Sequence, residues 1–165
     1  MRAETRPVGS VLVFFMIVET LKFLYERDLN KLKQEIELYQ DEATLWEVSG
    51  EIPNSGGNLC LHLVGNLKAF IGATLGGSGY VRQRDLEFST KGTPRAELIK
   101  GVDETLEVVL ASLDKVTSEQ LEQDYPIVVF ADKGPMTTEY FLIHLATHLS
   151  YHLGQINYHR RLFDK

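Results

Sequence analysis

Residues 144–159 read HLATHLSYHLGQINYH and contain four of the five histidines of the chain. Apolar residues recur around this stretch at the spacing of an α-helix, so we expect a helix that is capped by Thr137 or Thr138 and ends near Phe163. The apolar face of this helix is set by Leu142, Leu145, Leu149, Leu153 and Ile156. The sequence therefore predicts a long amphipathic helix that carries several imidazoles.

The spacing of these histidines limits how many can bind one ion. Residues four apart on a helix lie about 40° apart around its axis and about 6 Å apart along it, so two imidazoles can share a metal. Three at successive four-residue steps span about 12 Å, which is too far for one tetrahedral site. His152 lies nearest the centre of the apolar face, His148 next and His144 furthest. We therefore expect His148 and His152 to form the pair, with a third ligand from another part of the chain.

His62 is the one histidine outside this helix. It lies in a second predicted helix, Asn58–Leu75, which Asn54 or Ser55 can cap and which is apolar on most sides. Three histidines from two helices, with a position open to water or substrate, form the kind of site that binds a catalytic divalent ion. Two alternatives stay open from the residues alone. His62 can be a core histidine bonded to a carbonyl, and the His-rich helix face can be a solvated or pH-sensitive surface.

Several polar residues near these histidines have predicted roles. His144 is expected to flank the ligands, and Gln155 is a candidate neighbour of the same kind. Glu19 and Gln155 are candidates for a catalytic acid or base. His159, beside two arginines, is expected at the end of its helix, facing the negative end of the helix dipole.

Arg82 and Arg84 lie in a charged segment, Tyr80–Gly92, that also bears aromatic residues. With Asp85 they are expected to form ion pairs within the loop, although a guanidinium near a metal can also hold a substrate carboxylate. We therefore keep Arg82 and Arg84 as candidates for a substrate-binding loop. Cys60 is expected to be a small buried apolar residue.

The remaining elements set the fold class. A first helix is predicted from residue 11 or 17 to residue 39, and another from Thr93, as the cap, with Pro94 in its first turn, to about residue 115. The only strand-like run is Tyr125–Ala131. Four long helices with one long crossover connection predict an all-α protein, a four-helix bundle.

Length, charge and cysteine content exclude several classes of protein. The 165 residues suit one domain, and a net charge of −6 disfavours nucleic-acid binding. A single cysteine excludes an intrachain disulfide framework and a Cys-rich zinc module. A reducing, cytoplasmic location fits this composition.

The N-terminal residues 11–18 read VLVFFMIV and resemble the core of a short signal peptide. No small-residue cleavage site follows, and the run is far below the roughly 20 residues that span a bilayer, so no membrane partner is expected. Met16 lies inside this run and can be the true start. We expect residues 1–15 to be a non-native or upstream extension and residues 16–165 to form one domain. The alternatives are an apolar first helical turn and a membrane anchor.

The two histidine-bearing segments resemble the DinB-like (DinB/YfiT) superfamily of four-helix-bundle metalloproteins. Residues 58–67 read NLCLHLVGNL, and residues 148–155 fit the pattern His-x-x-x-His-x-Gly-Gln. Residues 79–88 are similar to a branch of small members, and the resemblance runs from about Met16 to the C-terminus. It implies that His62, His148 and His152 bind one nickel or zinc ion per chain, and that the protein is a homodimer. Members with known activities include thiol-dependent transferases and maleylpyruvate isomerases that use small thiols.

Two classes of function remain at this point. The first is a divalent-metal-dependent enzyme, a transferase or hydrolase that acts on a small molecule with a small thiol. The second is a non-catalytic, metal-binding dimer that serves stress responses or protein interaction. For the first class we expect an open position on the ion that faces a pocket walled by the first helix and the segment Tyr80–Phe88.

Overall fold

The computed structural model describes residues 8–165, and side chains from residue 14 onward. These residues form helices and loops and contain no strand, which confirms the all-α expectation. The four longest helices are α1 (Val8–Glu37), α2 (Gly56–Leu67), α4 (Arg95–Leu113) and α6 (Thr138–Phe163).

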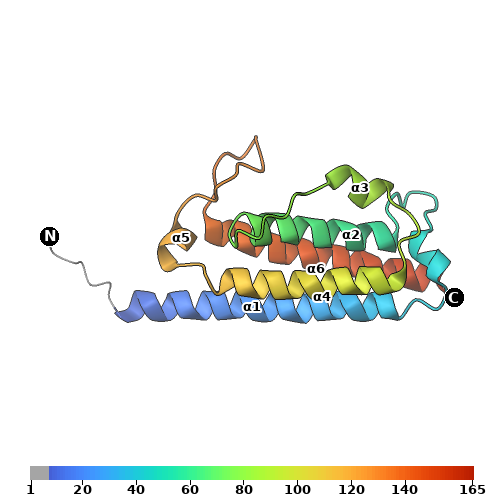
Figure 1. The fold of residues 1–165 in the computed structure, drawn as a ribbon, viewed down its shortest axis with the longest axis horizontal. Coiled ribbons are helices and arrows are strands. Elements are labelled where there is room, and N and C mark those ends of the chain that lie inside the picture. The colour runs from blue at the N-terminus through green and yellow to red at the C-terminus, as the bar shows by residue number, and fades with distance from the viewer. Residues whose placement is uncertain (1–7) are drawn as a thin grey trace.

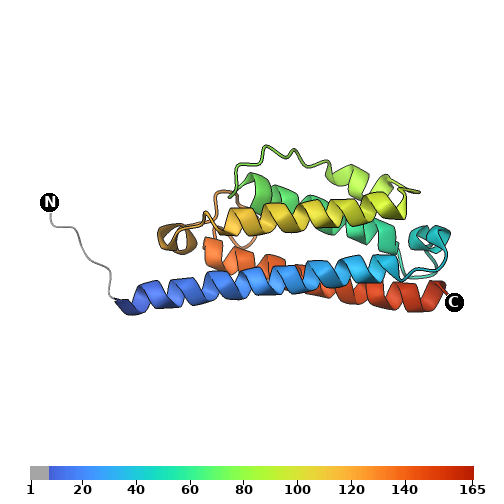
Figure 2. The same cartoon turned by 60° about the horizontal axis from the view of Figure 1, so that its bottom comes forward.

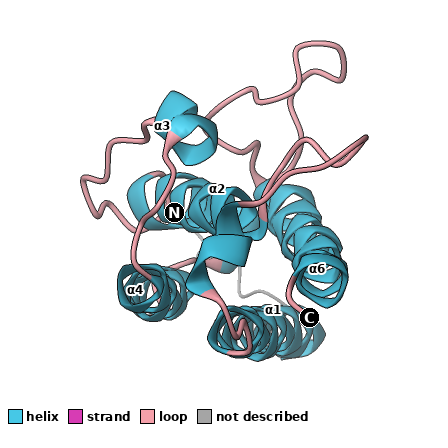
Figure 3. Ribbon diagram, turned by 90° about the vertical axis from the view of Figure 1, so that its right-hand side faces the viewer, coloured by secondary structure: helices cyan, strands magenta, loops and turns pink. Residues whose placement is uncertain are grey.

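These four helices lie side by side around a common core. α1 packs against α4 and α6, and α2 packs against the same two helices. Viewed from one end, they surround a shared interior (Figure 3). α1 and α6 run in one direction, and α2 and α4 run in the other (Figure 1).

The directions of the helices explain the long connection between α2 and α4. Both helices start at the same end of the molecule, so the chain must return along its length between them (Figures 1 and 2). α2 continues into the π-helix η2 (Lys68–Ala73), and the returning segment then forms α3 (Arg84–Ser89). Because α3 packs on the outside of α2, this connection covers the helix that carries His62.

Local hydrogen bonds fix where the helices begin. Ser55 accepts a hydrogen bond from the backbone of Asn58, and Thr137 accepts one from Tyr140, so both predicted caps are confirmed. The cap position of α4 is Pro94 rather than the expected Thr93. The shorter helices are the 3₁₀ helix η1 (Glu42–Trp46) and α5 (Ser118–Glu122).

The strand-like run Tyr125–Ala131 forms a loop and not a strand. Tyr125 donates its backbone N–H to Met136, and one isolated bridge joins Asp124 to Thr137. A strand needs a neighbouring strand to pair with, and the described residues offer none.

The core is built from buried apolar residues of all four long helices. On α1 the fully buried side chains are Leu21, Tyr25, Leu29, Leu32 and Ile36. The Tyr25 hydroxyl donates to the backbone carbonyl of Leu142, and Arg160 of α6 pairs with the buried Glu35 of α1. Cys60 is fully buried, as expected.

None of the described helices is both long enough and apolar enough to cross a membrane.

The expectation about residues 1–15 falls partly on residues 1–7, which lie outside the described residues. From Val8 onward the chain is already helical. Phe14 packs against the core, whereas Phe15 and Met16 are mostly exposed.

Candidate metal centre

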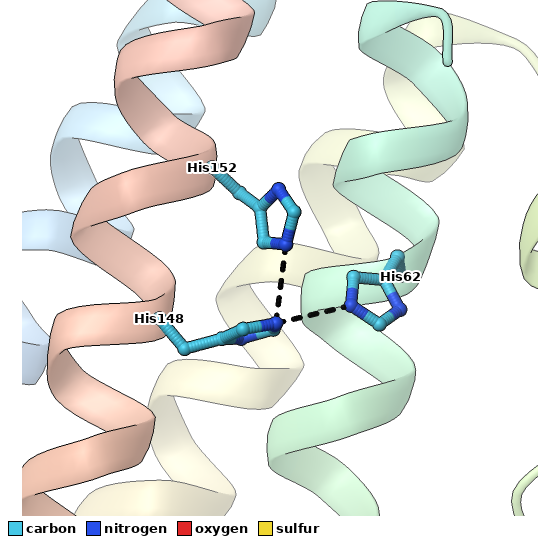
Figure 4. Close-up of side chains that lie close together, drawn as sticks. All are labelled: His62, His148 and His152. Carbon is cyan, nitrogen blue, oxygen red and sulfur yellow. Dashed lines mark hydrogen bonds between the residues drawn. The ribbon is translucent and has the colours of Figure 1, made fainter. Parts of the chain in front are cut away.

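Three imidazoles from two helices meet at one point. His62 extends from α2, and His148 and His152 extend from successive turns of α6 toward it (Figure 4). The Nε2 atom of His148 lies 3.3 Å from that of His62 and 3.1 Å from that of His152. The predicted trio is therefore brought together, with all three ligand atoms within 4.8 Å of one another.

The hydrogen bonds on the outer side of the rings fix which nitrogen carries the proton. His62 Nδ1 lies 2.9 Å from the Glu87 carboxylate, and His152 Nδ1 lies 2.6 Å from the side-chain oxygen of Gln155. These oxygens only accept, so both Nδ1 atoms must donate, and in a neutral ring the Nε2 atom then presents its lone pair to the centre. His148 can donate its Nε2 proton to only one of them. A cation bound between the rings would accept these lone pairs.

The spacing also fits the size of a divalent ion. Zinc bound to histidine has Zn–N distances near 2.0–2.1 Å, which in a tetrahedral site places the nitrogens about 3.3 Å apart. Two of the three Nε2 separations are 3.1 and 3.3 Å. The cluster can therefore hold a metal ion.

Glu87 on α3 joins the long connection between α2 and α4 to the histidine cluster. Its carboxylate is buried and accepts hydrogen bonds from His62 Nδ1 and, through both oxygens, from Arg82. Burial alone would raise the pKa of Glu87, but the hydrogen bonds from Arg82 and His62 outweigh it and lower the pKa. The carboxylate is therefore charged, and it orients the His62 ring.

Gly65 allows this approach of α3 to α2. A Cβ atom at this position would collide with the Glu87 carboxylate. Sequence reasoning missed Glu87, because it lies 25 residues from His62 in a segment expected to be an open loop. The need of a buried imidazole for an acceptor was the one available signal, and it does not say which of many carboxylates supplies it.

His148 has a strongly lowered pKa. Burial, followed by the neighbouring imidazoles, lowers its pKa to about 3, so its ring is neutral at physiological pH. Burial also lowers the pKa of His152. Neutral imidazole is the form that binds metal ions. The outer nitrogen of His148, Nδ1, is buried and has no hydrogen-bond partner.

A cavity of about 640 Å³ opens beside the three Nε2 atoms. Its walls come from α2, α6, the segment around Arg82 to Phe88, and the loop residues Val129 and Phe130. The expectation of a wall from the segment Tyr80–Phe88 is thus met in part. The expectation of a wall from the first helix is wrong, since α1 contributes no described residue; the loop before α6 takes that place.

The other predicted site residues have distinct positions. Gln155 bonds to His152, whereas His144 lines the cavity between Phe130 and Phe141 and stays outside the ligand cluster. Arg82 and Arg84 both line the cavity. The predicted ion pair of Arg82 is made with Glu87 rather than with Asp85.

Glu19 does not line the cavity. It is exposed and pairs with Lys22 on its own helix.

The prediction that His159 lies at the end of its helix and faces the helix dipole is wrong. Its ring is buried, Nε2 donates to the backbone carbonyl of Glu47, and Nδ1 accepts from the Tyr39 hydroxyl. α6 continues to Phe163, so His159 lies one turn inside the helix, and its face points inward against η1 and the end of α1. It joins segments of the fold instead of facing the helix dipole.

These features define an all-α protein with a three-histidine cluster that can hold a metal ion at the wall of a cavity. The sequence matches the family described as "Protein of unknown function (DUF1572)" over residues 16–165, and the chain belongs to that family. No curated protein and no solved structure matches the chain.

Proposed function

We propose that the protein is a divalent-metal-dependent enzyme whose ion is held by His62, His148 and His152. The observation that supports it is the convergence of their Nε2 atoms at the wall of a cavity, with Nδ1 of His62 and of His152 held as donors on the outer side. Three protein ligands leave a divalent ion a position for water or substrate. When bound, the ion would act as a Lewis acid that lowers the pKa of a bound water or stabilises a thiolate.

The residues around the ligands support this chemistry. Glu87 and Gln155 hold two of the imidazoles in the metal-binding tautomer, which is the usual arrangement around ligand histidines. Phe130 and Phe141 supply an apolar wall that limits water next to the ligands. From the resemblance to DinB-like proteins, the proposed reaction class is transfer or hydrolysis on a small molecule, with a small thiol as one reactant.

The wider proposal is a DinB-like four-helix bundle formed by residues 16–165. The two-plus-two arrangement of α1, α2, α4 and α6 and the pattern His-x-x-x-His-x-Gly-Gln on α6 support it. On this basis we propose one nickel or zinc ion per chain, a homodimer and a cytoplasmic location.

The direct test is metal content. Purified protein should contain close to one divalent ion per chain, measured by elemental analysis, and His148→Ala or His152→Ala should lose it. His144→Ala is the matched control, because His144 lines the same cavity on the same helix but lies outside the ligand cluster. Equal metal content in all variants contradicts the ligand assignment.

An open coordination position on the metal ion would distinguish an enzyme from a non-catalytic metal protein. In the cobalt-substituted protein the d–d bands should shift when azide or a small thiol is added, because the added ligand enters the coordination sphere. Bands that do not move at saturating ligand mean a closed site, and the dimeric stress or interaction protein then becomes the better assignment.

A further inference from the structure

The charged side chains that line the cavity are both positive, and one of them, Arg84, has no described counter-charge. Among the described residues that line it, Arg82 and Arg84 are charged and none is a carboxylate. The charge of Arg82 is balanced by Glu87, which lies behind it. Arg84 forms no ion pair with a described residue, and its guanidinium lies 5.7 Å from the centre of the Phe88 ring.

A divalent ion on three neutral imidazoles keeps its full charge, because neutral ligands bring no counter-charge. The ion and Arg84 then face one cavity without a protein anion. A charge in a partly dehydrated site is costly unless an opposite charge accompanies it. The cavity therefore favours an anionic occupant over a neutral one.

Most of the remaining wall of the cavity is apolar. Its apolar side chains are Phe70, Phe88, Val129, Phe130, Phe141 and Leu145, and its polar side chains are Asn54, Asn66 and His144. A volume of about 640 Å³ is far more than an inorganic anion fills, and it lies in the range of cavities that hold small organic molecules. An inorganic anion would leave these side chains in contact with water, whereas an apolar body would cover them.

We infer that the cavity binds a small organic anion with an aromatic or similarly sized apolar body. The anionic group lies toward the histidine cluster and Arg84, and the apolar body lies against Phe130 and Phe141. This inference rests on the proposed function, because the metal ion supplies the main charge that attracts the anion.

The test compares benzoate with acetate on the cobalt-loaded protein. The two carboxylates differ in the apolar body and little in basicity. The dissociation constant of each is read from the shift of the d–d bands. Benzoate should bind about tenfold or more tightly than acetate, because only benzoate buries a ring against the apolar wall. Benzyl alcohol, the neutral counterpart, should leave the bands unchanged.

Two variants assign the parts of the site. Phe130→Ala should weaken benzoate several-fold and leave acetate unchanged. Arg84→Gln should weaken both carboxylates, while Arg161→Gln, an exposed arginine of α6 that does not line the cavity, should weaken neither.

Equal affinity for benzoate and acetate, or binding of benzyl alcohol as tight as that of benzoate, would overturn the inference. Cobalt content is measured first. A protein that holds cobalt but binds no carboxylate refutes the ligand class and leaves the three ligands in place. A protein that holds no metal refutes the proposed function and this inference with it.

A separate observation concerns the outer nitrogen of His148. In the described residues, two buried side-chain polar atoms have no hydrogen-bond partner: Nδ1 of His148 and Oδ1 of Asn66. They are complementary, because Nδ1 carries the proton when Nε2 binds an ion, and an amide oxygen accepts. Asn66 is 6% exposed, lies one turn after His62 on α2 and lines the same cavity as His148.

We further infer that Asn66 is a positioning residue that accepts the Nδ1 proton of His148 in the metal-bound protein. All three ligand histidines would then have an outer partner: Glu87 for His62, Gln155 for His152 and Asn66 for His148. Such partners fix the tautomer and the direction of the ligand ring.

The test is zinc affinity, measured by competition with a coloured chelator. Asn66→Leu, which removes the acceptor and keeps the volume, should weaken zinc binding by about 10–100-fold. Asn66→Asp, which keeps an acceptor, should bind zinc at least as tightly as the parent protein. Asn54→Leu is the matched control, since Asn54 is another amide that lines the cavity.

Nuclear magnetic resonance measures the His148 Nδ1 proton directly. Its signal would not change if Asn66 had only a general structural role. The zinc-loaded parent protein should show a slowly exchanging His148 Nδ1 proton, and Asn66→Leu should lose this protection. Unchanged zinc affinity in Asn66→Leu together with an unchanged proton signal would overturn the assignment. If the leucine variant does not fold, a 10-fold loss of affinity in Asn66→Asp overturns it instead.

Discussion

The Nδ1 atom of His62 and the carboxylate of Glu87 lie 2.9 Å apart, although 25 residues separate them in the chain. This contact joins α2 to the long connection that runs back over it. It fixes the His62 tautomer, and it places Arg82, which also pairs with Glu87, at the edge of the cavity. The connection is therefore part of the candidate site.

The first prediction concerns Glu87 itself. Glu87→Ala should weaken zinc binding by about 10–100-fold, because His62 loses its acceptor and Arg82 loses its counter-charge. Glu87→Gln keeps an acceptor and should lose less. The measurement is chelator competition, with Glu104→Gln as the control, since Glu104 pairs with Lys68 on the surface. Equal affinity in Glu87→Ala and in the parent protein would show that the contact does not support the ligand.

The second prediction uses a pair of glycines. Gly65→Ala places a Cβ atom against the Glu87 carboxylate, so it should weaken zinc binding and lower the free energy of unfolding by about 1–3 kcal/mol. Gly101→Ala is the matched control on α4. Its Cβ would lie 3.7 Å from Val64, an ordinary contact, and it should gain about 0.5–1 kcal/mol from helix propensity. Chemical denaturation measures both changes, and equal effects in the two variants would refute the steric argument.

The third prediction concerns pH and His159. Burial lowers the pKa of His159 despite its hydrogen bond to Glu47, so the folded protein keeps the ring neutral where the unfolded chain begins to protonate it. The contribution of His159 to the free energy of unfolding is therefore complete above about pH 6.5, the pKa of histidine in the unfolded chain. This contribution is lost as the pH falls from that value through the lower pKa of the folded state. One such group contributes at most about 1.4 kcal/mol per pH unit.

The variant for this test is His159→Phe. It should be less stable than the parent protein at pH 7, by about 1–3 kcal/mol, because Tyr39 and Glu47 lose a partner. Its stability should also fall less steeply between pH 7 and pH 5 than that of the parent. Parallel stability curves over this range would mean that His159 does not contribute to the pH dependence.

The fourth prediction concerns the start of the chain. A protein that begins at Met16 should bind metal as the full chain does, because no described α1 residue lines the cavity. Its stability should fall by less than about 2 kcal/mol, since Phe14 is the main core contact among the described residues that are removed. A larger loss in chemical denaturation would place residues 8–15 in the native core.

The repeat of the α-helix explains what the sequence alone could predict. His148 and His152 were assigned as a pair because a four-residue step keeps side chains on one face, and that relation holds in any helix. The apolar setting of residues 58–67 predicted that His62 is buried, and Ser55 and Thr137 were recognisable as caps. Each of these properties depends on residues within one or two turns of one another.

The tertiary structure decided the relations between segments that are distant in the chain. Glu87 reaches His62 only because α2 and α4 run in the same direction, which forces the connection back over α2. His159 was misplaced because its partners, Tyr39 and Glu47, belong to the far end of α1 and the loop after η1. A helical period shows which face of a helix is buried, but the polar group that meets that face depends on how the helices pack. The sequence by itself therefore determined the candidate ligand pair and the helical class, while packing selected the groups that hold these imidazoles in place.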